Sequence, residues 1–266
     1  MRLSIITINL NNLEGLKRTF ESIVEQTCRD FEWIVVDGDS TDGSREYMEQ
    51  NKQYTSHYIS EKDTGIYNAM NKGIRMAKGE YLLFLNSGDW LYDRDTLAYA
   101  AIELKDADVV FGHIVNQYPF RSEIQTEPTM ATPIGLLHHD IPHQATFYKR
   151  EILAESKYDE DYTIAADWAK NWQLIFLGKK YKHINNTIAN YDKTGYSSTH
   201  YDVFIEERNR AIDQYTPIQV RPDIDQYLHF EEKWGYLSRR KSLRWLTSFF
   251  HKTSCRLDRL LSRFEK

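Results

Sequence analysis

The sequence predicts an α/β fold in which helices flank a central, mostly parallel sheet. Two short apolar runs rich in Ile and Val, at 3–8 and Phe31–Asp37, indicate buried strands. Apolar side chains at helical spacing fill residues 13–27 between them. A strand, a helix and a second strand in this order predict parallel strands joined by a right-handed crossover.

The same alternation continues through the first half of the chain. The expected elements are a helix over 43–50 capped by Asp42, a strand at 57–61, a helix over 66–77 stopped by Gly79, a strand at 81–85, a helix over about 95–105 and an extended segment at 108–115. Such a sheet binds ligands beyond the carboxyl ends of its strands.

The second half is less regular. From 116 to 146 the pattern is lost in a stretch that contains Pro and His. Helices are expected over 149–156 and 162–177, with Gly178 as a stop. A loop at 192–198 then precedes another helical region from His200.

Composition limits the class of protein. The chain has 266 residues, 41% hydrophobic and 27% charged, which is typical of a globular protein. A net charge of −5 argues against a nucleic-acid partner. Cys28 and Cys255 are its two cysteines, so we expect no disulfide framework and a reducing compartment. With no signal-peptide core and no run near the roughly 20 apolar residues that span a bilayer, we expect a cytoplasmic protein.

The tail from Arg239 has a charge opposite to that of the body. It holds nine Lys and Arg against two acids, a net of +7 that leaves −12 for the remainder. Leu243, Leu246 and Phe250 begin an apolar helical face that basic residues surround. Two interpretations are open: an interfacial helix over 239–264 on an anionic inner-membrane surface, or a helix packed on the body or on a second subunit, as in a homodimer.

Three polar clusters mark candidate chemistry. The first, from Asp37 to Gly43, follows a buried strand, where small residues permit a tight turn close to a ligand. The second runs Asn86-Ser87-Gly88-Asp89, and a carboxylate there suits Mg²⁺ or Mn²⁺ beside phosphates. The third is Asp167-Trp168 in an aromatic helical stretch. From the residues alone, each could instead be an ordinary turn or a solvent-facing helix position.

The clusters, taken in order, resemble the family 2 glycosyltransferases of the A-type fold, and most closely the colanic-acid and capsule-type members. The similarity runs from about residue 3 to 198. Its motifs are Ser4-Ile5-Ile6-Thr7, Asp37-Gly38-Asp39-Ser40-Thr41-Asp42-Gly43, Asp63-Thr64-Gly65-Ile66-Tyr67-Asn68-Ala69-Met70-Asn71-Lys72-Gly73, Gly79 to Asp89, His143-Gln144-Ala145, Asp167-Trp168 and Gly195-Tyr196-Ser197. Each motif is short, and their shared order and spacing is the specific signal.

The resemblance implies an inverting transferase that moves a hexosyl or N-acetylhexosaminyl group from a nucleotide diphosphate sugar, with UDP or GDP as the nucleotide. The acceptor would be a hydroxyl of a glycan or lipid-linked glycan in surface polysaccharide synthesis. Residues 1–115 would be the nucleotide-sugar-binding half of the catalytic domain, 116–220 the acceptor-binding half and 221–266 a basic helical extension. Membrane association, if present, would be peripheral.

The resemblance also assigns roles to residues. Asp167 would be the general base, and Asp89 would bind the Mg²⁺ or Mn²⁺ cation. The nucleotide and its diphosphate would be held by Thr7, Asn9, Asp37, Asp63, Lys72, Asn86 and Ser87. The 195–197 loop would close near the diphosphate or acceptor.

Two departures leave an alternative open. Many members of the family have paired acids where this chain has Asp37-Gly38, and an Asp-x-Asp-Asp motif where it has Asn86-Ser87-Gly88-Asp89. A catalytically degenerate nucleotide-sugar-binding protein with a role in assembly is therefore a second hypothesis. A dehydrogenase or methyltransferase would need a Gly-rich turn after the first strand, which Asn9-Leu10-Asn11-Asn12 does not supply. His138, His139 and His143 have no Cys or well-spaced acid beside them, which argues against a zinc site.

Overall fold

The computed structural model describes residues 2–125, 131–195 and 200–239. The chain divides into two compact units, Met1–Tyr215 and Thr216–Lys266. The first unit contains the elements β1 (Leu3–Asn9), α1 (Leu13–Val24), β2 (Phe31–Asp37), α2 (Ser44–Asn51), η1 (Lys52–Tyr54), β3 (His57–Ser60), α3 (Ile66–Met76), β4 (Tyr81–Phe84), β5 (Trp90–Leu91), α4 (Thr96–Glu103), β6 (Val109–Tyr118), β7 (Arg121–Gln125), α5 (Pro133–His138), η2 (His143–Ala145), β8 (Thr146–Lys149), α6 (Arg150–Glu155), α7 (Ala166–Phe176), β9 (Tyr181–Asp192) and α8 (Tyr201–Tyr215).

One mixed sheet organises this unit. Its strand order is β3-β2-β1-β4-β8-β6-β9-β5, with β7 paired to β6. Strands β3, β2, β1 and β4 are parallel neighbours, as the first half of the sequence predicts. Strand β8 then runs antiparallel to both β4 and β6, while β6 and β9 are parallel to each other. The expected mostly parallel α/β fold is therefore confirmed.

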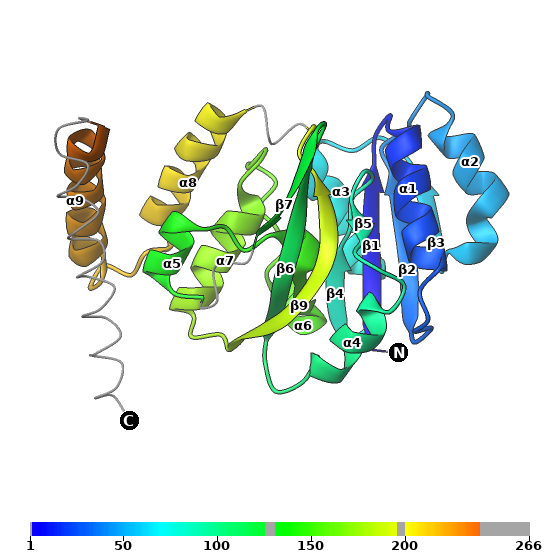
Figure 1. The fold of residues 1–266 in the computed structure, drawn as a ribbon, viewed down its shortest axis with the longest axis horizontal. Helices are drawn as coiled ribbons and strands as arrows, with labels where there is room; N and C mark the ends of the chain where they lie inside the picture. The colour runs from blue at the N-terminus through cyan, green and yellow to red at the C-terminus, as the bar shows by residue number, and fades with distance from the viewer. Residues whose placement is uncertain (1, 126–130, 196–199, 240–266) are drawn as a thin grey trace. The chain divides into compact units, whose positions relative to one another are not determined.

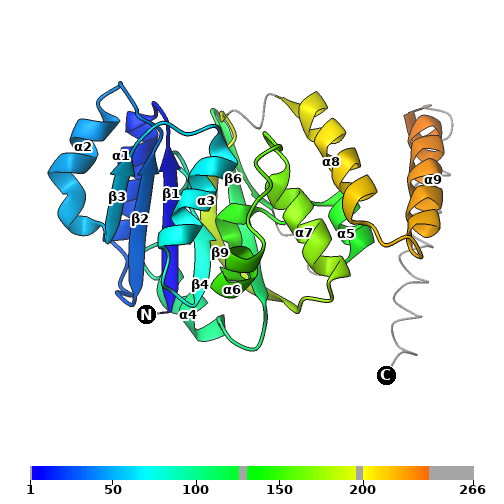
Figure 2. The ribbon, with the colours of Figure 1, turned by 180° about the vertical axis from the view of Figure 1, so that it is seen from behind.

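Helices cover both faces of the sheet. Helices α1 and α4 lie on the face seen in Figure 1, and α3 and α6 lie on the opposite face seen in Figure 2. Burial does not alternate along β1, because all seven of its residues are buried between these helical layers. Trp33 of β2 and Phe20 of α1 meet edge to face, with ring centroids 5.5 Å apart. Burial on both faces explains why these strands are continuous apolar runs.

Two helix boundaries show how local chemistry ends an element. Helix α3 ends at Met76, and Gly79 then packs so closely on β1 that an added Cβ would lie 2.6 Å from the backbone nitrogen of Ser4. Gly178 follows α7 with a φ of +69°, which suits a glycine past a helix end. Asp42 was expected to be the cap of α2, but the cap position is Gly43. Asp42 instead accepts from the backbone N–H groups of both Ser44 and Leu13, and so ties the starts of α2 and α1 together.

The second unit contains helix α9 (Arg221–Arg239). This helix agrees with the expected C-terminal helical extension. The basic segment 240–264, for which membrane or subunit contact is expected, lies outside the described residues. Within the part of the chain that the structure describes, no helix combines the length and the apolar character that crossing a membrane requires.

Candidate functional site

Polar side chains gather where β2, β1 and β4 end. Asn9 at the end of β1 donates from Nδ2 to Asp37 Oδ1 at 2.7 Å, which joins the ends of β1 and β2. The turn after β4 is tied to the same edge, because the Ser87 N–H donates to the carbonyl of Ile8 at 3.0 Å. Residues expected from three separate motifs are therefore brought to one edge of the sheet.

Asp37 shapes the turn after β2. Its carboxylate is fully buried and accepts from Asn9, from both the backbone and the hydroxyl of Ser40, and from the Ser60 hydroxyl. Four internal donors satisfy both oxygens. Asn9 Oδ1, in contrast, is buried without a hydrogen-bond partner among the described residues. Contact of either residue with a nucleotide stays a prediction.

The other residues expected near the nucleotide occupy different places. Thr7 is fully buried before the end of β1, and its hydroxyl accepts from Trp33 Nε1 at 3.0 Å, so it is not brought to the edge with the others. Asp63 lies beside Gly38, where an added Cβ would be 2.6 Å from its Oδ2. Lys72 donates to Glu61 at 2.9 Å and to the carbonyl of Lys62 at 2.8 Å.

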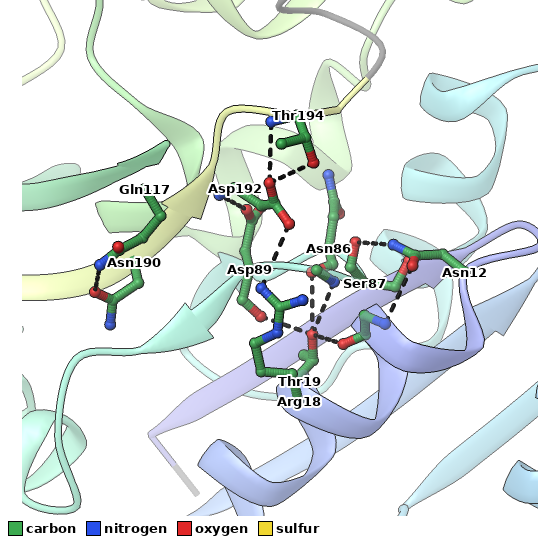
Figure 3. Close-up of polar contacts among 12 residues, drawn as sticks. Asn12, Arg18, Thr19, Asn86, Ser87, Asp89, Gln117, Asn190, Asp192 and Thr194 are labelled. Atoms are coloured by element: carbon green, nitrogen blue, oxygen red, sulfur yellow. Dashed lines mark hydrogen bonds and ion pairs between the residues drawn. The ribbon is translucent and has the colours of Figure 1, made fainter. Parts of the chain in front are cut away.

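The turn 86–89 is held from below by α1. The Thr19 hydroxyl donates to the carbonyl of Asp89 at 2.6 Å and accepts from the Gly88 N–H at 3.1 Å. Asn12 donates from Nδ2 to the carbonyl of Ser87 at 3.0 Å (Figure 3). Thr19 lies in α1 and Asn12 is the N-cap residue of the same helix, so the helix that follows β1 holds this turn in place.

Asp89 is buried beside the end of β9. Its Oδ1 accepts from the backbone N–H of Asp192 at 3.0 Å, and Arg18 of α1 lies 3.4 Å from Asp192 Oδ2 (Figure 3). Burial raises the pKa of Asp89 to about 6, against the opposing charge of His143 and hydrogen bonds from Asp192 and Gln144. Asp192 is a second acid near Asp89, and it belongs to a segment that the sequence predicts only as a loop.

Asp167 lies in the first turn of α7 and faces His143. His143 Nδ1 is 2.7 Å from Asp167 Oδ2, and the two side chains are only 15% and 12% exposed. The other oxygen, Oδ1, accepts from the Trp168 N–H at 2.8 Å. A helix N-terminus favours a negative charge at this position. Because His143 also lies 3.2 Å from Asn86, the third cluster is connected to the second.

Several carboxylates lie around the His143 ring and influence its pKa. Burial lowers the pKa of His143, but the hydrogen bond and charge of Asp167, with Asp89 and Asp140, outweigh it, and the pKa is raised. Burial and the charge of Asp167 raise the pKa of Asp140 to about 7. Asp140 was not expected at the site, because it lies in the stretch where the sequence shows no periodic pattern. Burial lowers the pKa of Lys193, and the nearby negative charges of Asp140 and Asp89 partly oppose this lowering.

Comparisons with known proteins give the site a context. Residues 4–166 match the family model described as glycosyl transferase family 2. The "PGL/p-HBAD biosynthesis glycosyltransferase" of Mycobacterium tuberculosis is 33% identical over 202 residues, which cover 72% of this chain and 77% of that protein. An uncharacterised glycosyltransferase of the same species is 36% identical over 173 residues, 62% of this chain and 65% of the relative.

Solved structures show the same fold. S. aureus TarS 1–349 in complex with UDP-GlcNAc has a TM-score of 0.66 at 20% identity, covering 91% of this chain and 75% of that one. The mannosyltransferase PcManGT from Pyrobaculum calidifontis, in complex with GDP-Man and Mn²⁺, has a TM-score of 0.64 at 18% identity, covering 96% and 80%.

Proposed function

The chain belongs to glycosyltransferase family 2, and from that membership we propose that it moves a sugar with inversion from a nucleotide diphosphate sugar, using Asp167 as the general base. The observation that carries the proposal is the Asp167 carboxylate, fixed at the start of α7 and joined through His143 to the turn that contains Asp89. The contacts of His143 with Asp167 and with Asn86 therefore connect the proposed base to the proposed cation-binding turn.

The proposed reaction is one displacement at the anomeric carbon. Asp167 takes the proton from the acceptor hydroxyl while that oxygen forms its bond to the anomeric carbon. The bond from this carbon to the diphosphate oxygen breaks on the opposite face, and the nucleoside diphosphate leaves. General-base assistance of this kind is typically worth about 10²–10⁴-fold in rate.

A cation would be shared between Asp89 and the donor. Among the described residues, no three His, Cys, Asp or Glu side chains are grouped so that they alone could hold a metal ion. The single buried carboxylate of Asp89 nevertheless fits Mg²⁺ or Mn²⁺, which commonly take one or two carboxylates together with substrate phosphates and water. When bound, such an ion would offset the negative charge that develops on the diphosphate.

The finer assignments concern donor, acceptor and location. We propose that Thr7, Asn9, Asp37, Asp63, Lys72, Asn86 and Ser87 form or support the nucleotide side. The UDP-GlcNAc and GDP-Man complexes of the structural relatives support a UDP or GDP donor and a hexosyl or N-acetylhexosaminyl group. The acceptor would be a glycan or lipid-linked glycan of a surface polysaccharide such as a capsule. The protein would be cytoplasmic and peripheral to the membrane through 239–264, or a homodimer through the same segment.

A nucleotide panel tests the donor class. The unfolding temperature of the full chain is measured with UDP, GDP, UDP-glucose, UDP-GlcNAc and GDP-mannose, each with and without Mn²⁺, and with NAD⁺ as the control. A donor at 100 times its Kd should stabilise the fold by about 2.7 kcal/mol. We expect a shift with one nucleotide class that Mn²⁺ enlarges. A shift with NAD⁺ alone, or none with any diphosphate, would contradict the proposal.

Product and membrane assays test the remaining parts. The anomeric configuration of the product, read by NMR, should be opposite to that of the donor, and retention would refute the displacement. Sedimentation with anionic liposomes should deplete the full chain from solution more than a chain that ends at Ser238. Equal sedimentation of the two would assign the tail to protein contacts instead.

A further inference from the structure

The structure places a histidine and an asparagine behind the carboxylate of Asp167, and we propose that Asn86, His143 and Asp167 form a positioning triad. This inference rests on the proposed role of Asp167 as base and adds two residues to it. His143 would fix the orientation of the Asp167 carboxylate, and Asn86 would fix the orientation of the His143 ring.

The carboxylate is held from two directions. Oδ2 faces His143 Nδ1 at 2.7 Å, and Oδ1 accepts from the Trp168 N–H at 2.8 Å. Rotation of the carboxylate would break both contacts. Tyr67 lies 3.2 Å from Oδ1, but its hydroxyl also donates to the carbonyl of Ile164, and one hydroxyl hydrogen cannot serve both acceptors. His143 and the Trp168 backbone are therefore the two groups that orient the base.

Asn86 meets the opposite edge of the ring. Because an ionised carboxylate only accepts hydrogen bonds, Nδ1 must carry a proton to bind Asp167. In the neutral ring Nε2 is then an acceptor, and Asn86 Nδ2 lies 3.2 Å from it. Asn86 Oδ1 is buried and has no hydrogen-bond partner among the described residues. If the ring gains a second proton, a half-turn of this amide would present Oδ1 to the new Nε2–H.

The hydrogen bond from His143 Nδ1–H to Asp167 can thus persist whether the His143 ring is neutral or protonated. The charges that face His143 are those of Asp167 on α7, Asp89 after β4 and Asp140 before η2. The Nδ1–H bond to Asp167 is the same whether or not Nε2 is protonated. The backbone of Asn86 is itself held in place, since the N–H of Asp89 donates to its carbonyl at 3.0 Å within the turn.

Three substitutions separate positioning from packing. His143→Leu removes the N–H that reaches Asp167, whereas His143→Asn offers an amide N–H in place of Nδ1–H. His113→Asn is the matched control, because His113 is another buried histidine, with Nε2 3.1 Å from Asn185 Oδ1, and lies outside the site. The full-length variants are assayed for release of UDP or GDP from UDP-GlcNAc, UDP-glucose or GDP-mannose, whichever the wild type turns over fastest. Calorimetry gives the Kd of the same nucleotide.

The expected pattern is a loss in kcat without a loss in binding. His143→Leu should lower kcat by about 10²-fold, the cost of a misplaced catalytic group, with the nucleotide Kd unchanged. His143→Asn should recover most of that loss, and His113→Asn should match the wild type. Wild-type kcat in His143→Leu, or equal losses in the Leu and Asn variants, would overturn the triad.

Asp167→Asn in the same series separates this inference from the proposed function. An inactive Asp167→Asn beside a fully active His143→Leu would refute the triad alone, whereas an active Asp167→Asn would refute the base. Should His143→Leu fail to fold, ¹⁵N NMR of the wild-type imidazole decides the question. The neutral ring should carry its proton on Nδ1, and a proton on Nε2 would overturn the inference.

Discussion

Glu207 of α8 anchors the segment that leads into the Asp167 helix, so replacing it with glutamine should loosen the base. One carboxylate oxygen accepts from the Thr163 N–H at 2.6 Å and the Thr163 hydroxyl at 2.8 Å. The other accepts from the N–H groups of Ile164 at 2.9 Å and Ala165 at 2.8 Å. Helix α7 begins at Ala166, directly after these three residues.

The expected loss of stability follows from the hydrogen bonds that a glutamine at position 207 cannot make. Its amide has one acceptor oxygen, so two of the four donors lose their partner and face an NH₂ group instead. Hydrogen bonds to a charged group contribute about 1.5–3 kcal/mol each. Glu207→Gln should therefore lower the free energy of unfolding by about 3 kcal/mol or more, which corresponds to roughly 6–12 °C in Tm.

The pH dependence gives an independent check. Burial raises the pKa of Glu207, but the backbone hydrogen bonds of Thr163, Ile164 and Ala165 outweigh it, and the pKa lies below its ordinary value of 4.5. When folding lowers the pKa of an acid, the ionised acid stabilises the folded state at pH values above its pKa in the unfolded chain. This stabilisation is lost as the pH falls through its pKa in the folded protein. The difference in the free energy of unfolding between wild type and Glu207→Gln should therefore be largest at pH 7 and should decrease below pH 4.5.

Urea unfolding at several pH values measures both effects, with Glu206→Gln as the control on the exposed side of the same helix. We also expect kcat to fall more than the affinity for nucleotide, because Asp167 moves while the ends of β1 and β2 do not. Equal stability of Glu207→Gln and Glu206→Gln at pH 7 would refute the reasoning.

Three further predictions concern buried groups elsewhere in the first unit. Burial lowers the pKa of Lys170 to about 8 from 10.5, a cost of about 3 kcal/mol at neutral pH. Allowing for its bonds to Ser156 and Gln173, Lys170→Met should raise stability at pH 7 by about 1–2 kcal/mol. Calorimetric scans should show that the extra stability of Lys170→Met over wild type disappears as the pH rises from 8 to 10.5. A variant that is less stable than wild type at pH 7 would contradict this prediction. Asp89→Ala should weaken nucleotide-sugar binding about tenfold or more in the presence of Mn²⁺ but little without it, and calorimetry showing equal effects would argue against a cation at Asp89. Gly79→Ala places a Cβ 2.6 Å from the backbone of β1 and should cost about 1–3 kcal/mol, whereas Gly195→Ala, whose nearest neighbour is 3.6 Å away, should leave Tm unchanged.

Strands β1, β2 and β4 could be predicted because each is a largely apolar run that is buried along almost its whole length. Strand β9 was missed because its register shifts between Phe111 and Ile114 of its partner, and the polar residues Asn185 and Asn186 interrupt the alternation at that point. Gly112 permits the irregularity, since an added Cβ would lie 2.5 Å from the carbonyl oxygen of Asn186. Such a shift depends on a partner strand some 70 residues earlier, so no local pattern reveals it.

In the site, too, residues in local motifs could be predicted, whereas contacts between residues distant in the sequence could not. Asp89 and Asp167 are found from motifs, but the contact between Asp167 and His143 joins α7 to η2, which packs against β4, β6 and β9. The sequence predicts that this helix starts at residue 162, whereas in the structure α7 begins at Ala166. The segment just before this start is held by Glu207, which accepts from the N–H groups of Thr163, Ile164 and Ala165 and lies about 40 residues further along the chain.

The central claim is that Asp167 is the base of a sugar-transfer reaction. Its most direct test is the rate of nucleoside diphosphate release by Asp167→Asn, measured beside its Kd for the same nucleotide and with the donor identified by the panel. The account predicts an unchanged Kd and a loss of at least about 10²-fold in rate. An Asp167→Asn variant that binds the nucleotide and turns over at the wild-type rate would contradict it.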